Sequence, residues 1–214
     1  VDVTDSAGNA AAQHSGSFSY DATAPSIVSS AFDFGAVLNA AEDDGDAVLN
    51  VTTSGVEDGQ VATLVLDGET YQGTVIGDAT SFTVSASDLQ ALTEGTIAYT
   101  VDVSDSAGNA AAQHSGSFSY DASASIVSSA FDFGAVLNAA EDDGDATLTV
   151  ATTDVDDGST VTVALNGQSY TGTVGAGSAA IVVAAADLQA LTEGTVAYTV
   201  DVTDSAGNAA AQHS

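Results

Sequence analysis

The sequence predicts an all-β chain made of tandem Greek-key β-sandwich modules of about 100 residues each. Three observations lead to this fold class: a long internal repeat, short segments in which apolar and polar residues alternate, and turns rich in Gly, Asn and Asp. About seven short strands separated by such turns are typical of a sandwich of this length.

The internal repeat sets the modules. The motif VDV(T/S)DSAGN begins three times, at intervals of 100 and then 99 residues, at Val1, Val101 and Val200. An interval of this size matches a whole domain, whereas solenoid units repeat every 20–50 residues or so. We therefore expect residues 1–20 to be the last two strands of a preceding module, 22–121 a complete module, and 122–214 a module without its final strand.

The strands follow from period-two patterns. Alternation is strictest in Thr96–Val103, where every second side chain is apolar. Shorter strands are predicted at Val61–Leu66, Ser81–Ser85 and Ser117–Tyr120. Asp-Gly and Asn-Gly pairs between such segments predict tight hairpin turns.

Two local motifs interrupt the strands. The segment Ser87–Leu92 predicts one helical turn with Ser87 as its N-cap. The spacing Leu92-x-x-Gly95-x-x-x-Tyr99 looks like the corner at which a tyrosine closes a β-sandwich.

Charge excludes several functions. The chain has 30 Asp and Glu residues and no Lys or Arg, which gives a net charge of -30. Without cations it cannot neutralise nucleic-acid phosphates, approach an anionic membrane or clamp a phosphate ligand. Cys is absent, which removes disulfides, thiolate nucleophiles and Cys-based zinc sites. No apolar run approaches the roughly 18 residues of a membrane span.

The order of motifs within the repeat resembles a known family. GVEDGQ begins at Gly55, LDGETYQGTV at Leu66, SASDLQALTEGTIAYTVDVSDSAGN at Ser85, and YDATAPSI at Tyr20. The chain is similar to the bacterial immunoglobulin-like repeats of giant secreted adhesins, the long repeats-in-toxin and biofilm adhesins of Gram-negative bacteria. The resemblance implies an extracellular rod at the bacterial surface, exported by a type I system, stiffened by Ca²⁺ and serving as an extender for a ligand-binding tip. Its partners would be neighbouring modules, head to tail.

The residues give a second reason to expect Ca²⁺. Many acids are clustered in loops, as in the EDDGD sequence that starts at Glu42. Close carboxylates repel one another unless a cation lies among them, and Ca²⁺ accepts 6–8 oxygen ligands in irregular geometry. Loops of Asp, Asn and Gly supply such ligands, so we expect several ions per module.

Topology predicts where these loops meet. We assign the B–C loops to Gly55–Gly59 and Asp154–Gly158, the F–G loops to DSAGN at Asp5, Asp105 and Asp204, and the A–B loops to Glu42–Asp46 and Glu141–Asp145. In an immunoglobulin-like sandwich the B–C and F–G loops lie at the N-terminal end of a module, and the A–B loop lies at the other end. The linker residue before each module would then join two acidic loops in one inter-module cation site. The candidate ligands are Asp5, Asn9, Asp21, Asp43, Asp44, Asp46, Glu57, Asp58, Asp105, Asn109, Asp121, Asp142, Asp143, Asp145, Asp154, Asp156, Asp157, Asp204 and Asn208.

Plainer interpretations remain open. EDDGD can be a solvated turn and lacks the spacing of an EF-hand, and DSAGN can be a simple hairpin turn. His14, His114 and His213 occur once per repeat beside Ser, and their repetition favours a surface role over a catalytic triad. We expect no catalytic residue and no small-molecule substrate. The alternatives to a spacer are a module that binds a ligand or surface directly and a halophilic domain whose acidity serves solubility.

Overall fold

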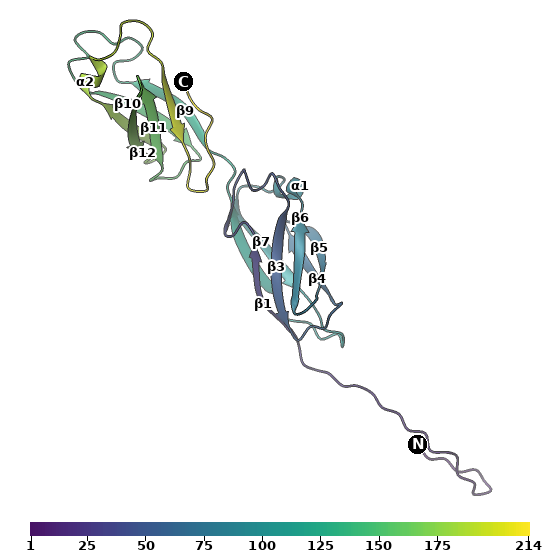
Figure 1. Ribbon diagram of the computed structural model, residues 1–214. Helices are drawn as coiled ribbons and strands as arrows, with labels where there is room; N and C mark the ends of the chain where they lie inside the picture. Colours follow the sequence, from purple (N-terminus) through teal and green to yellow (C-terminus); the bar gives the residue numbers. More distant parts are fainter.

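Two β-sandwich modules lie end to end, and an extended N-terminal segment leads into the first of them (Figure 1). The computed structural model describes all 214 residues. We call residues 22–121 module 1 and residues 122–214 module 2. The chain exposes 11933 Å² of surface, whereas a compact protein of this mass would expose roughly 9,000 Å². The excess reflects the elongated arrangement.

Module 1 consists of two sheets, with strand orders β1-β3-β6 and β2-β8-β7-β4-β5. Neighbouring strands are antiparallel except β2 and β8, which run parallel. The all-β sandwich class predicted from the sequence is confirmed. The bounds are β1 (Ser26–Phe32), β2 (Val37–Leu38), β3 (Ala47–Ser54), β4 (Val61–Leu66), β5 (Glu69–Thr74), β6 (Ala79–Val84), α1 (Ala86–Leu89), β7 (Gly95–Asp102) and β8 (His114–Tyr120).

The core of module 1 lies between the two sheets and contains 19 buried apolar residues. Strand β7 has the predicted alternation, since Tyr99 and Val101 are buried while Ala98 is exposed. Three aromatic rings pack together in this core: Phe118 of β8 lies 5.1 Å from Phe32 and 5.0 Å from Phe34, centroid to centroid. The last strand is therefore part of the core as well as of the sheet.

The predicted N-cap of the helical turn is wrong by two residues. Helix α1 begins at Ala86, and its N-cap is Ser85, whose hydroxyl accepts the N–H of Asp88 at 3.3 Å. Ser87 lies inside the first turn and contacts the Ser85 hydroxyl instead. Neither of the two helices, each of four residues, is long and apolar enough to cross a membrane.

Module 2 repeats the first module without counterparts of strands β2 and β8. Its sheets have orders β13-β10-β9 and β12-β11-β14. The apolar interior divides into clusters of nine and four buried residues. The bounds are β9 (Ser125–Phe131), β10 (Ala146–Thr153), β11 (Thr160–Leu165), β12 (Gln168–Thr173), β13 (Ser178–Val183), α2 (Ala185–Leu188) and β14 (Tyr198–Val202).

Residues 1–20 form no strand. One isolated bridge, between Thr4 and Ala10, closes the DSAGN turn, and the side chains are exposed. The sequence predicts the last two strands of a sandwich here, and the segment has the sequence of such strands without a partner sheet.

Candidate functional site at the module junction

The junction between the modules is centred on Asp121, in the linker that joins β8 to β9. Its backbone N–H donates to the Leu38 carbonyl at 3.0 Å. Its own carbonyl accepts the side-chain amide of Asn208 at 2.9 Å. The linker is thus held by module 1 on one side and by the F–G loop of module 2 on the other.

The F–G loop of every repeat folds around its own aspartate. Oδ1 of Asp204 accepts the backbone N–H groups of Gly207 and Asn208, and Oδ2 accepts the Asn208 side chain, all at 2.8 Å. At Asp105 and Asp5 the aspartate again accepts the asparagine backbone and side chain, but the other backbone N–H comes from the loop alanine, Ala107 or Ala7, instead of the glycine. Hydrogen bonds from the loop asparagine and then from backbone N–H groups lower the pKa of Asp105 and of Asp5. DSAGN is therefore a self-contained turn centred on a carboxylate.

Asn208 also joins the two modules. Its Oδ1 accepts the backbone N–H of Ala40 at 2.9 Å. Beside it, the side-chain amide of Asn39 donates to the Ala206 carbonyl at 2.9 Å. The A–B loop of module 1 and the F–G loop of module 2 meet here, in the arrangement that the topology predicts.

Glu94, in the loop between α1 and β7, belongs to the junction although it is absent from the predicted ligands. Its Oε1 accepts the backbone N–H of Ala122 at 2.9 Å, and its Oε2 accepts the Ser123 hydroxyl at 3.2 Å. The LTEG motif that contains it indicates only a turn. Nothing in the local sequence shows that this turn faces the linker 28 residues later.

Asp156 reaches the junction from the B–C loop of module 2. Its carboxylate accepts the hydroxyl and the backbone N–H of Ser205 in the F–G loop, and these bonds lower the pKa of Asp156. In module 1, Glu57 makes the same contacts with Ser106, at 2.6 and 2.8 Å, and its pKa is lowered for the same reason. The B–C acid thus braces the F–G loop in both modules.

The junction carries negative charge that the chain cannot neutralise. Burial raises the pKa of Asp121, and repulsion from Asp204, Glu94 and Asp156 raises it further. A groove of about 530 Å³ runs beside the linker and is lined in part by Glu94, Asp121, Asp154 and Asp156. The chain has no Lys or Arg to offset these carboxylates.

The donor chemistry of the junction suits Ca²⁺, which binds carboxylate, amide and carbonyl oxygens. In the present arrangement, however, no three Asp, Glu or His side chains form a group that could hold a metal ion. The carboxylates of Glu94, Asp156 and Asp204 instead accept hydrogen bonds from nearby N–H and O–H groups. A cation would bind here only if some of these side chains turned away from their present partners.

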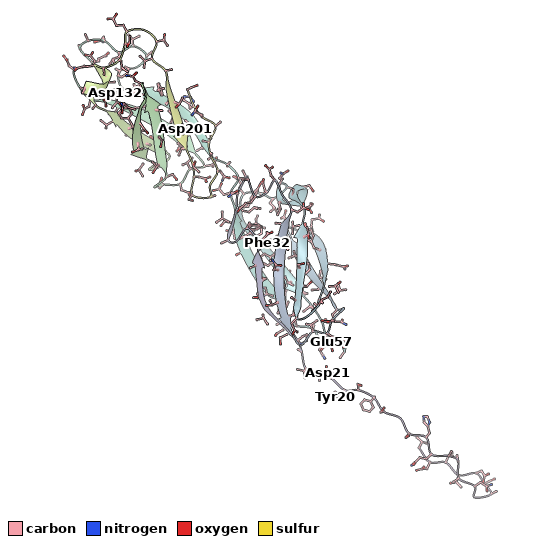
Figure 2. The ribbon with its side chains drawn as sticks, in the orientation of Figure 1. Tyr20, Asp21, Phe32, Glu57, Asp132 and Asp201 are labelled. Atoms are coloured by element: carbon pink, nitrogen blue, oxygen red, sulfur yellow. The ribbon has the colours of Figure 1, made fainter.

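At the opposite end of module 1, Asp21 and Glu57 lie where the N-terminal segment joins the sandwich (Figure 2). The Asn109 amide reaches the Asp21 carbonyl at 3.4 Å, a longer contact than its counterpart at Asp121. Asp58 turns one carboxylate oxygen toward its own module, where it accepts the Gly77 N–H at 2.7 Å. Asp157 does the same with Ala176 in module 2.

The first aspartate of the A–B loop is a buried partner of the last strand. Asp43 is 6% exposed, and its Oδ2 accepts the Tyr120 hydroxyl at 2.6 Å. Burial, together with this bond to a carboxylate, raises the pKa of Tyr120 to about 12. Asp142, the corresponding residue of module 2, is half-buried and has no tyrosine partner.

The other two aspartates of the A–B loop accept hydrogen bonds from residues in and next to the short helix. Oδ1 of Asp44 accepts the Gln90 side chain at 3.1 Å, and Oδ1 of Asp46 accepts the Ala86 N–H at 3.0 Å. Asp143 and Asp145 make the corresponding bonds in module 2. These hydrogen bonds within each module account for the acidic residues of the A–B loops. Metal binding by the same residues stays a prediction.

The repeated histidine has a contact that the sequence did not reveal. His114 is half-buried, and its Nε2 lies 2.8 Å from the Ser30 hydroxyl, which in turn lies 2.8 Å from the Tyr99 hydroxyl. The three side chains connect strands β1, β7 and β8. Tyr99 therefore links the two sheets through a serine side chain, whereas the hydroxyl of a tyrosine corner bonds the backbone a few residues upstream.

No protein-family model and no curated protein sequence matches the chain. Several solved protein structures do match the chain. A Ca²⁺-stabilized adhesin that helps an Antarctic bacterium reach out and bind ice matches 99% of this chain at 30% identity, with a TM-score of 0.51. A structure from a 1.5-MDa bacterial ice-binding adhesin matches 99% at 27% identity, also with a TM-score of 0.51. This chain spans 53% of the first structure and 69% of the second.

A single bacterial immunoglobulin-like domain from the M. primoryensis ice-binding adhesin also matches, at 29% identity over 46% of this chain and 99% of that one, with a TM-score of 0.33. The sandwich topology and the two longer matches decide the family. The chain is a tandem array of bacterial immunoglobulin-like modules. The family predicted from the order of motifs is thus confirmed, and the bacterial immunoglobulin-like modules found here resemble parts of large adhesins.

Proposed function

We propose that the chain is a spacer in the extender of a secreted adhesin on a bacterial surface, and that Ca²⁺ at the module junction fixes the angle between modules. The observation that carries this proposal is the convergence of Glu94, Asp121, Asp156 and Asp204 with no cationic side chain. The exact repetition of Ser26–Ala47 at Ser125–Ala146, and of the DSAGN loop, also supports it, because a spacer needs length, whereas a binding site needs loops that differ from copy to copy.

The mechanism follows from charge. Without a cation, four carboxylates at one junction repel one another, and this repulsion favours orientations in which the modules swing apart. A bound Ca²⁺ would take oxygens from the linker, from the turn before β7 and from the B–C loop of the next module. Because these ligands belong to both modules, one ion would oppose rotation of one module against the other.

The ligand set is tested by comparing Glu94→Gln with Glu193→Gln. These residues occupy the same position in modules 1 and 2, but only Glu94 faces a linker and a following module within residues 1–214. Calorimetric titration with CaCl₂ should show Ca²⁺ affinity at the junction lowered at least about tenfold in Glu94→Gln, since even residues that support a metal ligand change affinity 10–100-fold. Glu193→Gln should leave this binding step unchanged.

Equal Ca²⁺ binding by the wild type and Glu94→Gln would remove Glu94 from the ligand set. No Ca²⁺ binding by the wild type would end the calcium proposal. If NaCl at matched ionic strength raised the melting temperature as much as millimolar Ca²⁺, the acidity would serve solubility in salt, as in the halophilic alternative.

A further inference from the structure

Asn50 is the one asparagine of the chain that lies in a β-strand. The other six lie in loops or turns, and five of these make side-chain hydrogen bonds there, as Asn109 and Asn208 do in the F–G loops. Asn50 lies in the middle of β3, and its side chain is exposed and has no hydrogen-bond partner in the chain. Asparagine is depleted in strands, and module 2 has Thr149 at the same position. Neither hydrogen bonding nor strand propensity therefore accounts for an asparagine at residue 50.

The two residues that follow Asn50 complete the acceptor motif for N-linked glycosylation. Asn50-Val51-Thr52 is the only Asn-x-Ser/Thr sequence in the chain. Module 2 has Thr149-Val150-Ala151 instead, so both defining residues of the motif are absent there. The two modules therefore differ at this point in a feature that their shared fold does not require.

The outer face of the sheet leaves space for a sugar at Asn50. Alternation in β3 places Asn50 and Thr52 on this face, since Val51 between them is buried. Strand β3 lies between β1 and β6 (Figure 1), and Asn50 pairs with Ala31 on one side and Ser81 on the other. Both neighbours have small side chains, so the Asn50 amide is not covered from either side.

This face of the sheet is also free of charge. No residue of β1, β3 or β6 is Asp or Glu, although the chain contains 30 such residues. Electrostatic repulsion between two acidic molecules is therefore weakest at this face. A sugar is bulky and hydrophilic, and at Asn50 it would keep a second molecule from packing here.

We propose that Asn50 is an N-glycosylation site. The Asn50 Nδ2 attacks the anomeric carbon of a sugar that is activated by a nucleotide diphosphate or by a lipid-linked diphosphate. A C–N bond forms, the bond between this carbon and the phosphate oxygen breaks, and one amide proton is lost to a base of the transferase. The products are glycosylated Asn50 and the released diphosphate. Asn50 is not a residue of the junction, so glycosylation and Ca²⁺ binding can be tested separately.

The sugar is attached before module 1 folds. An enzyme that binds all three residues of the motif needs access to their backbone, whereas β3 is paired along both edges in the folded sheet. The Thr52 hydroxyl, which the motif requires, also contacts the Ser29 hydroxyl at 2.7 Å. The acceptor is therefore the unfolded chain. Because Asn50 faces outward, the module can then fold with the sugar in place.

Mass spectrometry of the protein purified from its source bacterium tests the proposal. The chain has no Lys or Arg, so trypsin leaves it uncut, and a protease that cleaves after Asp and Glu is used instead. This protease releases residues 47–57 from module 1 and residues 146–154 from module 2, which contain the corresponding strands. The first peptide should have the added mass of a sugar, and the second should not. A single monosaccharide indicates a nucleotide-linked donor, whereas an oligosaccharide transferred whole indicates a lipid-linked donor.

Three substitutions in the full chain locate the sugar. Thr52→Ser keeps the motif and should keep the sugar, whereas Thr52→Val removes the motif and should lose it. Asn50→Thr introduces the residue that module 2 has at this position, so the module keeps its fold and should have no sugar. An unmodified peptide 47–57 in the wild type overturns the proposal. A sugar that persists in Asn50→Thr, or one found on residues 146–154, also overturns it, because the sugar would then be attached to a hydroxyl.

Discussion

The contribution of Asn208 to the junction can be separated from its role in the F–G loop, because Asn109 occupies the same position in module 1. Both side chains donate to their loop aspartate at 2.8 Å. Asn208 alone accepts the Ala40 N–H at 2.9 Å, and it reaches the linker carbonyl at 2.9 Å where Asn109 reaches it at 3.4 Å. Asn208 thus makes about two additional good hydrogen bonds across the junction.

A buried or half-buried hydrogen bond contributes about 0.5–1.5 kcal/mol net. We therefore expect Asn208→Ala to lower the free energy of unfolding of module 2 by about 1–3 kcal/mol more than Asn109→Ala lowers that of module 1. Native-state hydrogen exchange in EDTA measures both, from the slowest amides of β10 and β3. The Ala40 amide should lose protection only in Asn208→Ala. Equal losses in the two modules, or a protected Ala40 amide in Asn208→Ala, would contradict this account of the junction.

Three further predictions concern module 1. Tyr120→Phe leaves the Asp43 carboxylate buried without its donor and should cost about 1–3 kcal/mol in urea unfolding, more than Tyr71→Phe, whose partner is less buried. Gly116→Ala drives a Cβ into the tyrosine ring of β7 and should cost about 1–3 kcal/mol or more, whereas Gly16→Ala meets open space and should cost almost nothing in the monomer. Burial and carboxylate partners raise the pKa of Tyr120 and of Tyr71 to about 12 from 10.0, so the neutral tyrosines stabilise the fold below pH 10 and this stability is lost toward pH 12. Melting temperatures against pH should show this loss, and it should disappear when both tyrosines are replaced by Phe.

The fold was predictable because its signals are local or exactly repeated along the chain. Alternation in Thr96–Val103 matches β7 closely, and the repeat interval gives the module length. The N-cap was misassigned because Ser85 and Ser87 are both good caps by residue type, and the choice depends on where the preceding strand β6 ends.

The sequence predicted which loops form the junction, but it did not predict which side chains contact one another there. Immunoglobulin-like topology places Asp121, Asp156 and Asn208 at one junction. Topology alone does not indicate that Glu94 turns back onto the linker, because that contact depends on the path of the chain between α1 and β7. In the EDDGD loop, the run of acids predicts a cation site. Asp43 of this loop instead accepts a hydrogen bond from the hydroxyl of a tyrosine 77 residues later in the sequence.

Small-angle X-ray scattering tests the central claim that Ca²⁺ at the junction makes the array rigid. The maximum dimension of the particle should be larger in Ca²⁺ than in EDTA at matched ionic strength, and Glu94→Gln should reduce this difference. Equal maximum dimensions of the wild type in Ca²⁺ and in EDTA would contradict the claim.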